Sequence, residues 1–351
     1  NGNSILSAMK KLVILLISAV CTFGSATGQD VHFSQFMQAP MQINPGLTGM
    51  IPANIRANLA YRSQWASVTT PYRTFLFSGD VKIPVSDYVS LGAGLNFYRD
   101  MAGDTKFGTT SAKLALSSIV TIDDHNEISA GLMGGIMQVG MDPSALQWDS
   151  QYQGGSYNGA IDPGENLDLN PGIMPDLSAG VVYHYHSEEG YMTANDQLNV
   201  KIGAAFNHFI RPKMTFMNSD TLYSNITMFA DAQIGIGNSR WTAMPSVLYM
   251  MQGPARELTF GGLMRFRLQD ASQITGFIKG AFLYLGGYYR IRDAFAPMVM
   301  LEFDRYALGV SYDLNTSPLA VASNMRGGLE ITFRFMTPNP YLYQGQRASF
   351  R

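Results

Sequence analysis

The sequence predicts an all-β protein, namely a transmembrane antiparallel β-barrel of the outer-membrane type with about fourteen strands. Charged residues make up only 14% of the chain, compared with about 25% in an average soluble domain. After residue 28, no apolar run reaches the roughly 18 residues that a membrane-spanning helix requires. Apolar and polar residues instead alternate over segments of about ten residues, which is the pattern of strands with one lipid face and one lumen face.

The N-terminus predicts a secretory signal peptide over residues 1–28. Met9 and two lysines precede the apolar run LVILLISAVCTFGSA, and Ala26 and Gly28 fit the small positions of a cleavage site. We therefore expect the mature chain to start at Gln29, with residues 1–8 upstream of the natural start. The single cysteine, Cys21, lies inside this signal, so we expect no disulfide in the mature chain. The residue before Cys21 is not one of the small residues that lipid attachment favours, so we do not expect a lipoprotein.

Residues 29–53 form an N-terminal segment that cannot fold by itself. It is rich in amide, methionine and aromatic side chains, is broken by Pro40 and Pro45, and shows no helical or strand period. A polar barrel lumen would offer its amides hydrogen-bond partners. We expect residues 35–47 to pack as a plug against the barrel interior or its periplasmic mouth. The motif residues assigned to this plug are Phe33, Gln35, Asn44, Pro45 and Gly46.

Residues 54–335 are expected to form the barrel. In the first strand, Ile55 and Leu59 point one way, while Asn54 and Arg56 point the other. The expected lipid face includes Leu59, Phe75, Leu95, Val200, Phe260 and Phe333. Strands are expected near 54–62, 72–83, 89–99, 107–120, 127–139, 176–186, 198–208, 225–236, 241–251, 256–268, 274–285, 286–303 split in two, 306–314 and 327–335, with 336–351 as a C-terminal tail. Twelve strands is the alternative count, because boundaries blur between residues 271 and 303.

The connections predict which end of the barrel faces outward. Segments 141–175, 209–224 and 315–325 are long, whereas the intervening turns are mostly short, which fits long extracellular loops and short periplasmic turns. Long loops on a rigid scaffold often carry function, so we expect a polypeptide partner to bind there, with the lumen beneath. The alternative is that the loops shield the mouth against solutes. Candidate partner-binding residues are Trp148, Tyr152, Tyr157 and Phe216 in the loops and Arg265 and Arg267 in the lumen.

Two groups of side chains suggest metal binding at first sight. His184 and His186 share one strand face, but two imidazoles without a third ligand at recognisable spacing are more often ordinary wall residues. The loop from Asp162 to Gly172 is rich in oxygen ligands but lacks the order of a calcium loop. We therefore expect no metal site and no cofactor.

Catalysis is also not expected. Asp313, with Ser311 and Glu330, could suggest a hydrolytic barrel of the phospholipase type, but no Ser/His/acid set shares a predicted face and level. Charges of both signs face the expected lumen, where they either pair with one another or grip a polypeptide or plug. The net charge of −2 gives no indication of a nucleic-acid surface.

Short motifs add a family resemblance. F-S-Q-F-M from Phe33, I-N-P-G-L-T-G from Ile43 and Y-R-S-Q-W from Tyr61 resemble the start of PorP/SprF-type outer-membrane proteins of the type IX secretion system in Bacteroidota. G-Y-Y-R from Gly287, L-G-V-S-Y-D-L from Leu308 and G-G-L-E-I from Gly327 continue the likeness, although Leu329 stands where the family often has His.

The resemblance implies a non-enzymatic barrel in the outer membrane that works with the type IX machinery, including its periplasmic ring. It also implies a role in export or surface attachment of a large secreted adhesin, through the C-terminal sorting domain of that adhesin. The alternative function is transport of a small solute through the barrel. Outer-membrane lipids are the remaining expected partner.

Overall fold

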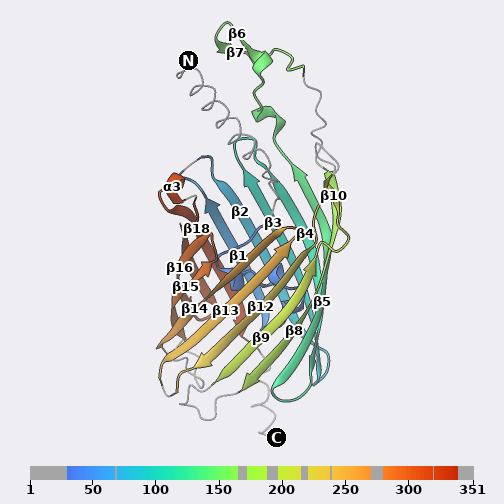
Figure 1. Ribbon diagram of the computed structural model, residues 1–351. Coiled ribbons are helices and arrows are strands. Elements are labelled where there is room, and N and C mark those ends of the chain that lie inside the picture. The colour runs from blue at the N-terminus through green and yellow to red at the C-terminus, as the bar shows by residue number, and fades with distance from the viewer. Residues whose placement is uncertain are drawn as a thin grey trace, which may run out of the picture.

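The computed structural model describes residues 30–67, 69–164, 172–187, 197–214, 220–237, 239–269, 280–318 and 320–338. The predicted signal peptide, Gln29, Phe216 and the tail beyond residue 338 lie outside these residues. The described strands confirm the predicted fold class, because fourteen antiparallel strands form one closed barrel in which β1 pairs with β18 (Figure 1). They are β1 (Ala53–Gln64), β2 (Tyr72–Pro84), β3 (Val89–Ala102), β4 (Phe107–Thr121), β5 (Asn126–Gly140), β8 (Gly172–Ser187), β9 (Leu198–Asn207), β12 (Asn225–Gly235), β13 (Trp241–Gln252), β14 (Ala255–Gln269), β15 (Ala281–Arg290), β16 (Ala294–Phe303), β17 (Tyr306–Asn315) and β18 (Arg326–Pro338).

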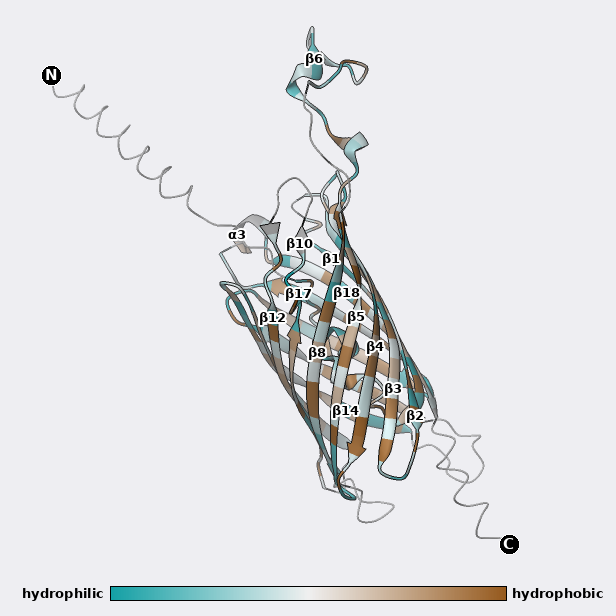
Figure 2. Cartoon of the chain, turned by 90° about the vertical axis from the view of Figure 1, so that its right-hand side faces the viewer, coloured by the Kyte–Doolittle hydropathy of each residue, from teal (hydrophilic) through white to brown (hydrophobic). Residues whose placement is uncertain are grey.

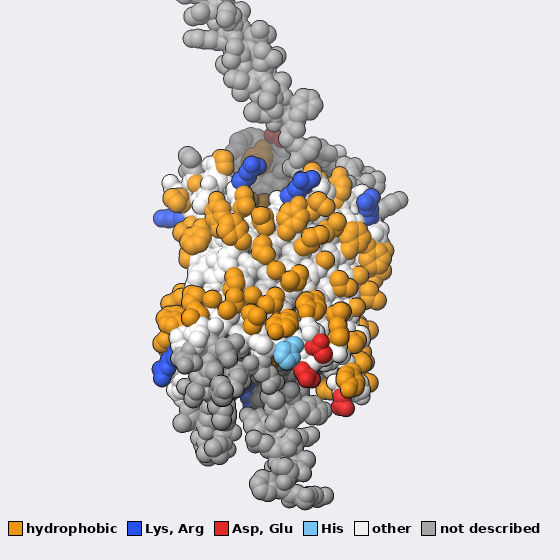
Figure 3. Space-filling model, turned by 60° about the horizontal axis from the view of Figure 1, so that its bottom comes forward, with side chains coloured by type: hydrophobic (Ala, Val, Ile, Leu, Met, Phe, Trp, Pro, Cys, Tyr) orange, Lys and Arg blue, Asp and Glu red, His pale blue; other side chains and the backbone are white. Residues whose placement is uncertain are grey.

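The outer wall of the barrel is hydrophobic because alternate side chains of each strand point away from the lumen. Strand colouring alternates along the wall in Figure 2, and Figure 3 shows hydrophobic side chains covering the wall, with charged side chains gathered towards its ends. Five of the six residues predicted for the lipid face are exposed, and Val200 is half-buried. Among the described residues, no helix is long and apolar enough to cross a membrane.

We expect the substitution Leu95→Arg to destabilise the barrel. Leu95 lies in the middle of β3 with 42% of its surface exposed, and a charge on the lipid face near the bilayer centre costs about 2–4 kcal/mol. Urea unfolding in lipid vesicles measures this free energy, and Leu95→Ala controls for the lost packing. Equal stability of the two variants would contradict the assignment of this face to lipid.

The two ends of the barrel differ in the length of their connections. One end carries residues 141–171 and 208–224, which contain η3 (Pro143–Ala145), η4 (Asp149–Gln151), β6 (Tyr152–Gln153), β7 (Ser156–Tyr157), β10 (Lys213–Met214) and β11 (Asp220–Thr221). The same end carries α3 (Ala320–Ser323). By the rule of long extracellular loops, this is the outer end. The β6–β7 hairpin projects well beyond the barrel rim (Figures 1 and 2).

The division predicted for residues 274–303 is wrong. Within the described residues of this stretch there are two strands, β15 and β16, where three were expected. The pair Gly286–Gly287 suggests a break in the sequence, but it stays inside β15, where each glycine lies against the backbone of a neighbouring strand. The turn falls instead at residues 291–293, where Arg292 has a left-handed φ of 63°. Smaller differences are that β8 starts at Gly172, before the predicted 176, and β18 continues to Pro338.

The N-terminal segment lies inside the barrel and forms three short helical turns, η1 (Phe36–Gln38), α2 (Pro40–Ile43) and η2 (Pro45–Leu47). Pro40 and Pro45 are the first residues of their turns, where the missing N–H costs nothing. Phe36, Ile43 and Leu47 are buried. They belong to a hydrophobic cluster with inward-facing wall residues, among them Ile119, Val182, Phe229, Leu248, Leu263, Tyr284, Tyr288, Met298 and Met300. The centre of the lumen is therefore largely apolar, whereas the sequence predicts a polar lumen.

Candidate functional site

The first clamp on the N-terminal segment is the carboxylate of Glu330 in β18. Its Oε2 and Oε1 accept hydrogen bonds from the backbone N–H groups of Ser34 and Gln35, both at 2.8 Å. Glu330 is 1% exposed, so these charge-assisted bonds form away from water, where they are strong. The side chain of Gln35 extends the clamp, because its amide donates to Ser311 Oγ and its Oε1 accepts from Thr332 Oγ1.

A buried ion cluster supports the same clamp. Asp313 Oδ2 in β17 lies 2.8 Å from both Arg62 Nη2 in β1 and Arg290 Nη2 in β15. Its Oδ1 accepts a hydrogen bond of 2.6 Å from the hydroxyl of Ser34. Arg62 also donates to the backbone carbonyl of His32. Since the network joins the wall to the segment, wall charges both pair with one another and grip the plug.

The second clamp is Asn44, which is fully buried. Its side-chain amide donates to the carbonyls of Val181 in β8 and Ala204 in β9, at 3.0 and 2.9 Å. Its Oδ1 accepts from the N–H of Gly46 at 2.8 Å and so caps the turn that follows. One asparagine therefore connects two wall strands with the local fold of the segment.

Glycines of the wall make room for the second clamp. A Cβ at Gly131 in β5 would overlap the carbonyl group of Pro45 and come within 2.6 Å of the nitrogen of Gly46. A Cβ at Gly180 in β8 would overlap the side chain of Asn44. These glycines allow the close approach of backbone to wall that a larger residue would prevent.

The inner end of the segment is held by the third clamp, Asp80 in β2. Asp80 accepts from the N–H of Gly49 at 2.7 Å and from Arg56, which also donates to the carbonyl of Leu47 at 3.1 Å. The hydroxyl of Ser117 donates to the carbonyl of Thr48 at 2.6 Å. The chain then enters β1 at Ala53, so the segment traverses the lumen from its outer to its inner end.

The outer start of the segment is fixed by His208, which follows β9. Its Nδ1 lies 2.8 Å from Asp176 Oδ1 and its Nε2 lies 2.9 Å from Asp30 Oδ2. Burial disfavours the imidazolium, but the two carboxylates outweigh it and raise the pKa of His208 to about 9. Burial also disfavours the charged form of Asp30, yet hydrogen bonds from His208, Asn225 and Gln252 hold the pKa of Asp30 below its usual value. This part of the segment is thus pinned by charges of opposite sign at neutral pH.

A polar cavity of about 660 Å³ lies at the outer end of the lumen. Residues 30–32 of the segment form part of its lining. The ring of Trp65 meets the ring of Tyr72 edge-on, with centroids 5.0 Å apart. Apart from Ile291, the other lining residues carry a charge or a polar group, and the charged ones, of both signs, are Arg62, Asp100, Arg256, Glu257, Arg290 and Asp293. Such a lining suits a ligand with both charged and amide groups.

The residues predicted for the plug all lie in the lumen. Phe33, Gln35, Asn44, Pro45 and Gly46 are buried. The sequence predicts that lumen-facing charges, Glu330 among them, pair with one another or grip a plug, but it suggests Ser311 and Asp313 only as a hydrolytic set with Glu330. All three instead hold Ser34 or Gln35. Strand alternation places these three residues on the lumen face, but it does not reveal which residues they contact.

The candidate partner-binding residues fall into two groups that the structure does not bring together. Tyr152 and Tyr157 pair across the β6–β7 hairpin at the outer end, with exposed rings 5.5 Å apart, and Trp148 precedes η4 nearby. Arg265 and Arg267 lie near the inner end of β14, where Arg265 stacks over Phe282 at 5.2 Å. Partner binding by either group stays a prediction.

Comparisons with known proteins give the following similarities. Among solved structures, the chain is similar to a Pseudomonas aeruginosa FadL homologue, with TM-score 0.47, 9% identity, and coverage of 84% of this chain and 92% of that chain. For the Ralstonia pickettii toluene transporter TbuX, the TM-score is 0.43 and the identity is 10%, with coverage of 88% of this chain and 96% of that chain. For CdiB from Acinetobacter baumannii, the TM-score is 0.41 and the identity is 7%, with coverage of 80% of this chain. The chain spans 60% of the length of that protein. Curated protein sequences give no match.

The family comparison covers nearly the whole barrel and its N-terminal segment. The matching family model is described as type IX secretion system membrane protein PorP/SprF and aligns with residues 25–335. This range includes all three clamps and thirteen complete barrel strands, with only the end of β18 beyond it. The chain therefore belongs to the PorP/SprF family and is an outer-membrane β-barrel component of the type IX secretion system.

Proposed function

We propose that this barrel receives the C-terminal sorting domain of a large secreted adhesin at its outer end and supports its export and attachment to the cell surface. Components of the periplasmic ring would associate with the inner end. The observation that carries the proposal is the cavity at the outer end, whose lining includes residues 30–32 of the N-terminal segment and charged wall residues of both signs. A ligand that enters from outside therefore meets a lined pocket.

The chemistry of this pocket favours a polypeptide over a small hydrophobic solute. Its mixture of arginines, carboxylates and aromatic rings matches the charged and amide groups of a peptide. Above it, the β6–β7 hairpin offers two exposed tyrosines, and tyrosine is a frequent anchor of protein interfaces.

The alternative, small-solute transport, requires a path through the lumen. Phe36, Ile43 and Leu47 fill the centre of the described lumen together with inward-facing wall residues. Transport would therefore require this segment to move and its clamps to break. This requirement favours secretion over transport as the function.

We expect the double substitution of Tyr152→Ser and Tyr157→Ser to reduce surface display. Loss of interface anchors commonly costs about 2 kcal/mol or more each, so display should fall by tenfold or more. The measured protein is the large secreted protein whose surface level falls when the barrel gene is deleted, quantified by protease shaving of whole cells. Tyr88→Ser is the matched control, because Tyr88 is exposed at a turn of the opposite end.

Deletion of residues 151–168 separates the two roles of the loop. Loss of display with normal barrel abundance supports the partner site. Unchanged display with increased entry of solutes would instead show that the loop is a shield. Unchanged display and unchanged solute entry would leave the loop without either role and would refute this part of the proposal.

A further inference from the structure

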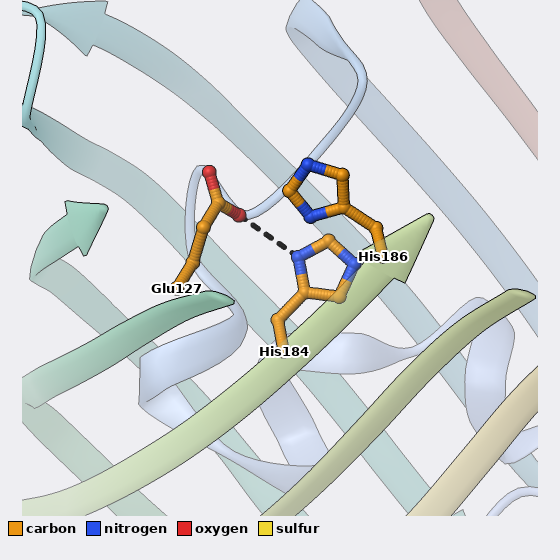
Figure 4. A group of neighbouring side chains, drawn as sticks. All are labelled: Glu127, His184 and His186. Carbon is orange, nitrogen blue, oxygen red and sulfur yellow. Dashed lines mark hydrogen bonds and ion pairs between the residues drawn. The ribbon is translucent and has the colours of Figure 1, made fainter. Parts of the chain in front are cut away.

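We propose that Glu127, His184 and His186 form a binding site for one divalent transition-metal ion, of the zinc type, at the inner end of the lumen. Glu127 lies near the start of β5, and the two histidines lie near the end of β8. Figure 4 shows that all three side chains point toward one another. Their ligand atoms lie within 4.8 Å of one another. The third ligand missing from the sequence pattern is thus supplied by the neighbouring strand.

The strand register creates this convergence. Glu127 and His184 are direct partners in the β5–β8 ladder. His186 lies two residues further along β8, on the same face, and its ring stacks on that of His184 with centroids 5.1 Å apart. In a tetrahedral zinc site with bonds of about 2.0–2.1 Å, ligand atoms lie about 3.4 Å apart. Glu127 and His186 are half-buried and His184 is 9% exposed, and metal binding would draw their ligand atoms together by side-chain rotation.

The hydrogen bonds of His184 orient it as a ligand. Its Nε2 lies 2.9 Å from Oδ1 of Asn199 in β9, so this nitrogen can donate its proton to the amide oxygen. The other nitrogen, Nδ1, lies 2.8 Å from Glu127 Oε2. In the absence of a metal, a proton lies between His184 Nδ1 and Glu127 Oε2. A bound metal ion would replace that proton. An acceptor behind a ligating imidazole is the usual support of a metal-bound histidine. Binding would release the bridging proton to solvent.

The ligand set also selects the type of metal. Two imidazoles and one carboxylate suit zinc, copper or nickel, whereas calcium and magnesium prefer sites made of oxygen ligands. Lys82 and Lys201 lie close enough to Glu127 to interact with its charge. Because these lysines oppose any cation electrostatically, most of the affinity for the metal must come from its bonds to the imidazole nitrogens. Three protein ligands leave a fourth position for water or a ligand from the lumen.

The test is metal binding by the whole protein, purified in detergent through a tag without histidine. After chelation and equilibration with zinc, we expect one bound equivalent. His184→Ala and His186→Ala should each weaken binding more than about 100-fold, and Asn199→Ala about 10- to 100-fold, as for other supporting residues. His125→Ala is the matched control and should change binding less than about twofold, because this exposed histidine lies outside the cluster.

Cobalt(II) absorption provides a second measurement, since a tetrahedral site with nitrogen and oxygen ligands gives a visible band that should disappear in the His184→Ala variant. Glu127→Gln keeps the shape of the side chain and removes its charge, so it tests the third ligand if alanine variants fail to fold. Absence of stoichiometric zinc, zinc binding at the wild-type level by the His184→Ala and His186→Ala variants, or loss of binding in His125→Ala would each overturn the proposal.

Discussion

The substitution Glu330→Ala is expected to release the N-terminal segment from the lumen wall at its outer half. It removes both acceptors of the N–H groups of Ser34 and Gln35 and leaves these buried donors unsatisfied. Hydrogen bonds to charged groups contribute about 1.5–3 kcal/mol each, so docking should weaken by about 3–6 kcal/mol. Since 1.4 kcal/mol corresponds to a factor of ten, exchange of these two amide hydrogens should accelerate by about two to four orders of magnitude.

Two variants make this expectation specific. Glu330→Gln keeps one acceptor oxygen and should show about half the loss of free energy. Glu302→Ala is the matched control, because the Glu302 carboxylate contacts wall residues Arg334 and Tyr284 and not the N-terminal segment. If Glu302→Ala accelerates exchange at Ser34 and Gln35 as much as Glu330→Ala does, the clamp does not act locally.

The clamps explain how far sequence reasoning could reach. The two faces of each strand are a local property with a period of two, so Leu59 and Phe75 could be assigned to the lipid side from the sequence. The dependence of the N-terminal segment on a host follows from its composition. The bond from Ser34 to Glu330, in contrast, joins residues 296 positions apart. It exists because β18 closes the barrel against β1, and no local pattern encodes that distance.

The apolar centre of the lumen shows a second limit. Phe229, Leu248 and Tyr284 point inward, so their strands carry large apolar residues on both faces. If alternation is taken to mean a lipid face opposite a polar lumen face, these inward-facing apolar residues are overlooked. Their packing against the N-terminal segment shows that they form a core. Likewise, Glu127 and His184 are 57 positions apart, and their contact depends on the register of β5 against β8 across a long loop.

The glycines of the wall lead to the second large expected effect. The substitution Gly131→Leu should expel η2 from its position, because a side chain there must occupy the space of the Pro45 carbonyl and the Gly46 nitrogen. The backbone of Pro45 and Gly46 cannot rotate away as a flexible side chain can. Displacing this backbone breaks the two hydrogen bonds from Asn44 to β8 and β9. Overpacking typically costs about 1–3 kcal/mol, and the loss of the Asn44 bonds adds about 1 kcal/mol each.

Gly134→Leu is the matched control for this effect. Gly134 lies in the same strand but faces outward, where an added Cβ comes close to the end of the Leu177 side chain, at 2.6 Å, and meets the Asp176 carbonyl oxygen only at an ordinary contact distance of 3.9 Å. Proteolysis of residues 35–50 and conductance in planar bilayers measure the outcome together. We expect Gly131→Leu to increase both, and Gly134→Leu to leave both near the wild-type level. Increased proteolysis without conductance would show that the inward side chains of the wall close the lumen by themselves, and that the segment serves to shape the outer cavity rather than to seal the barrel.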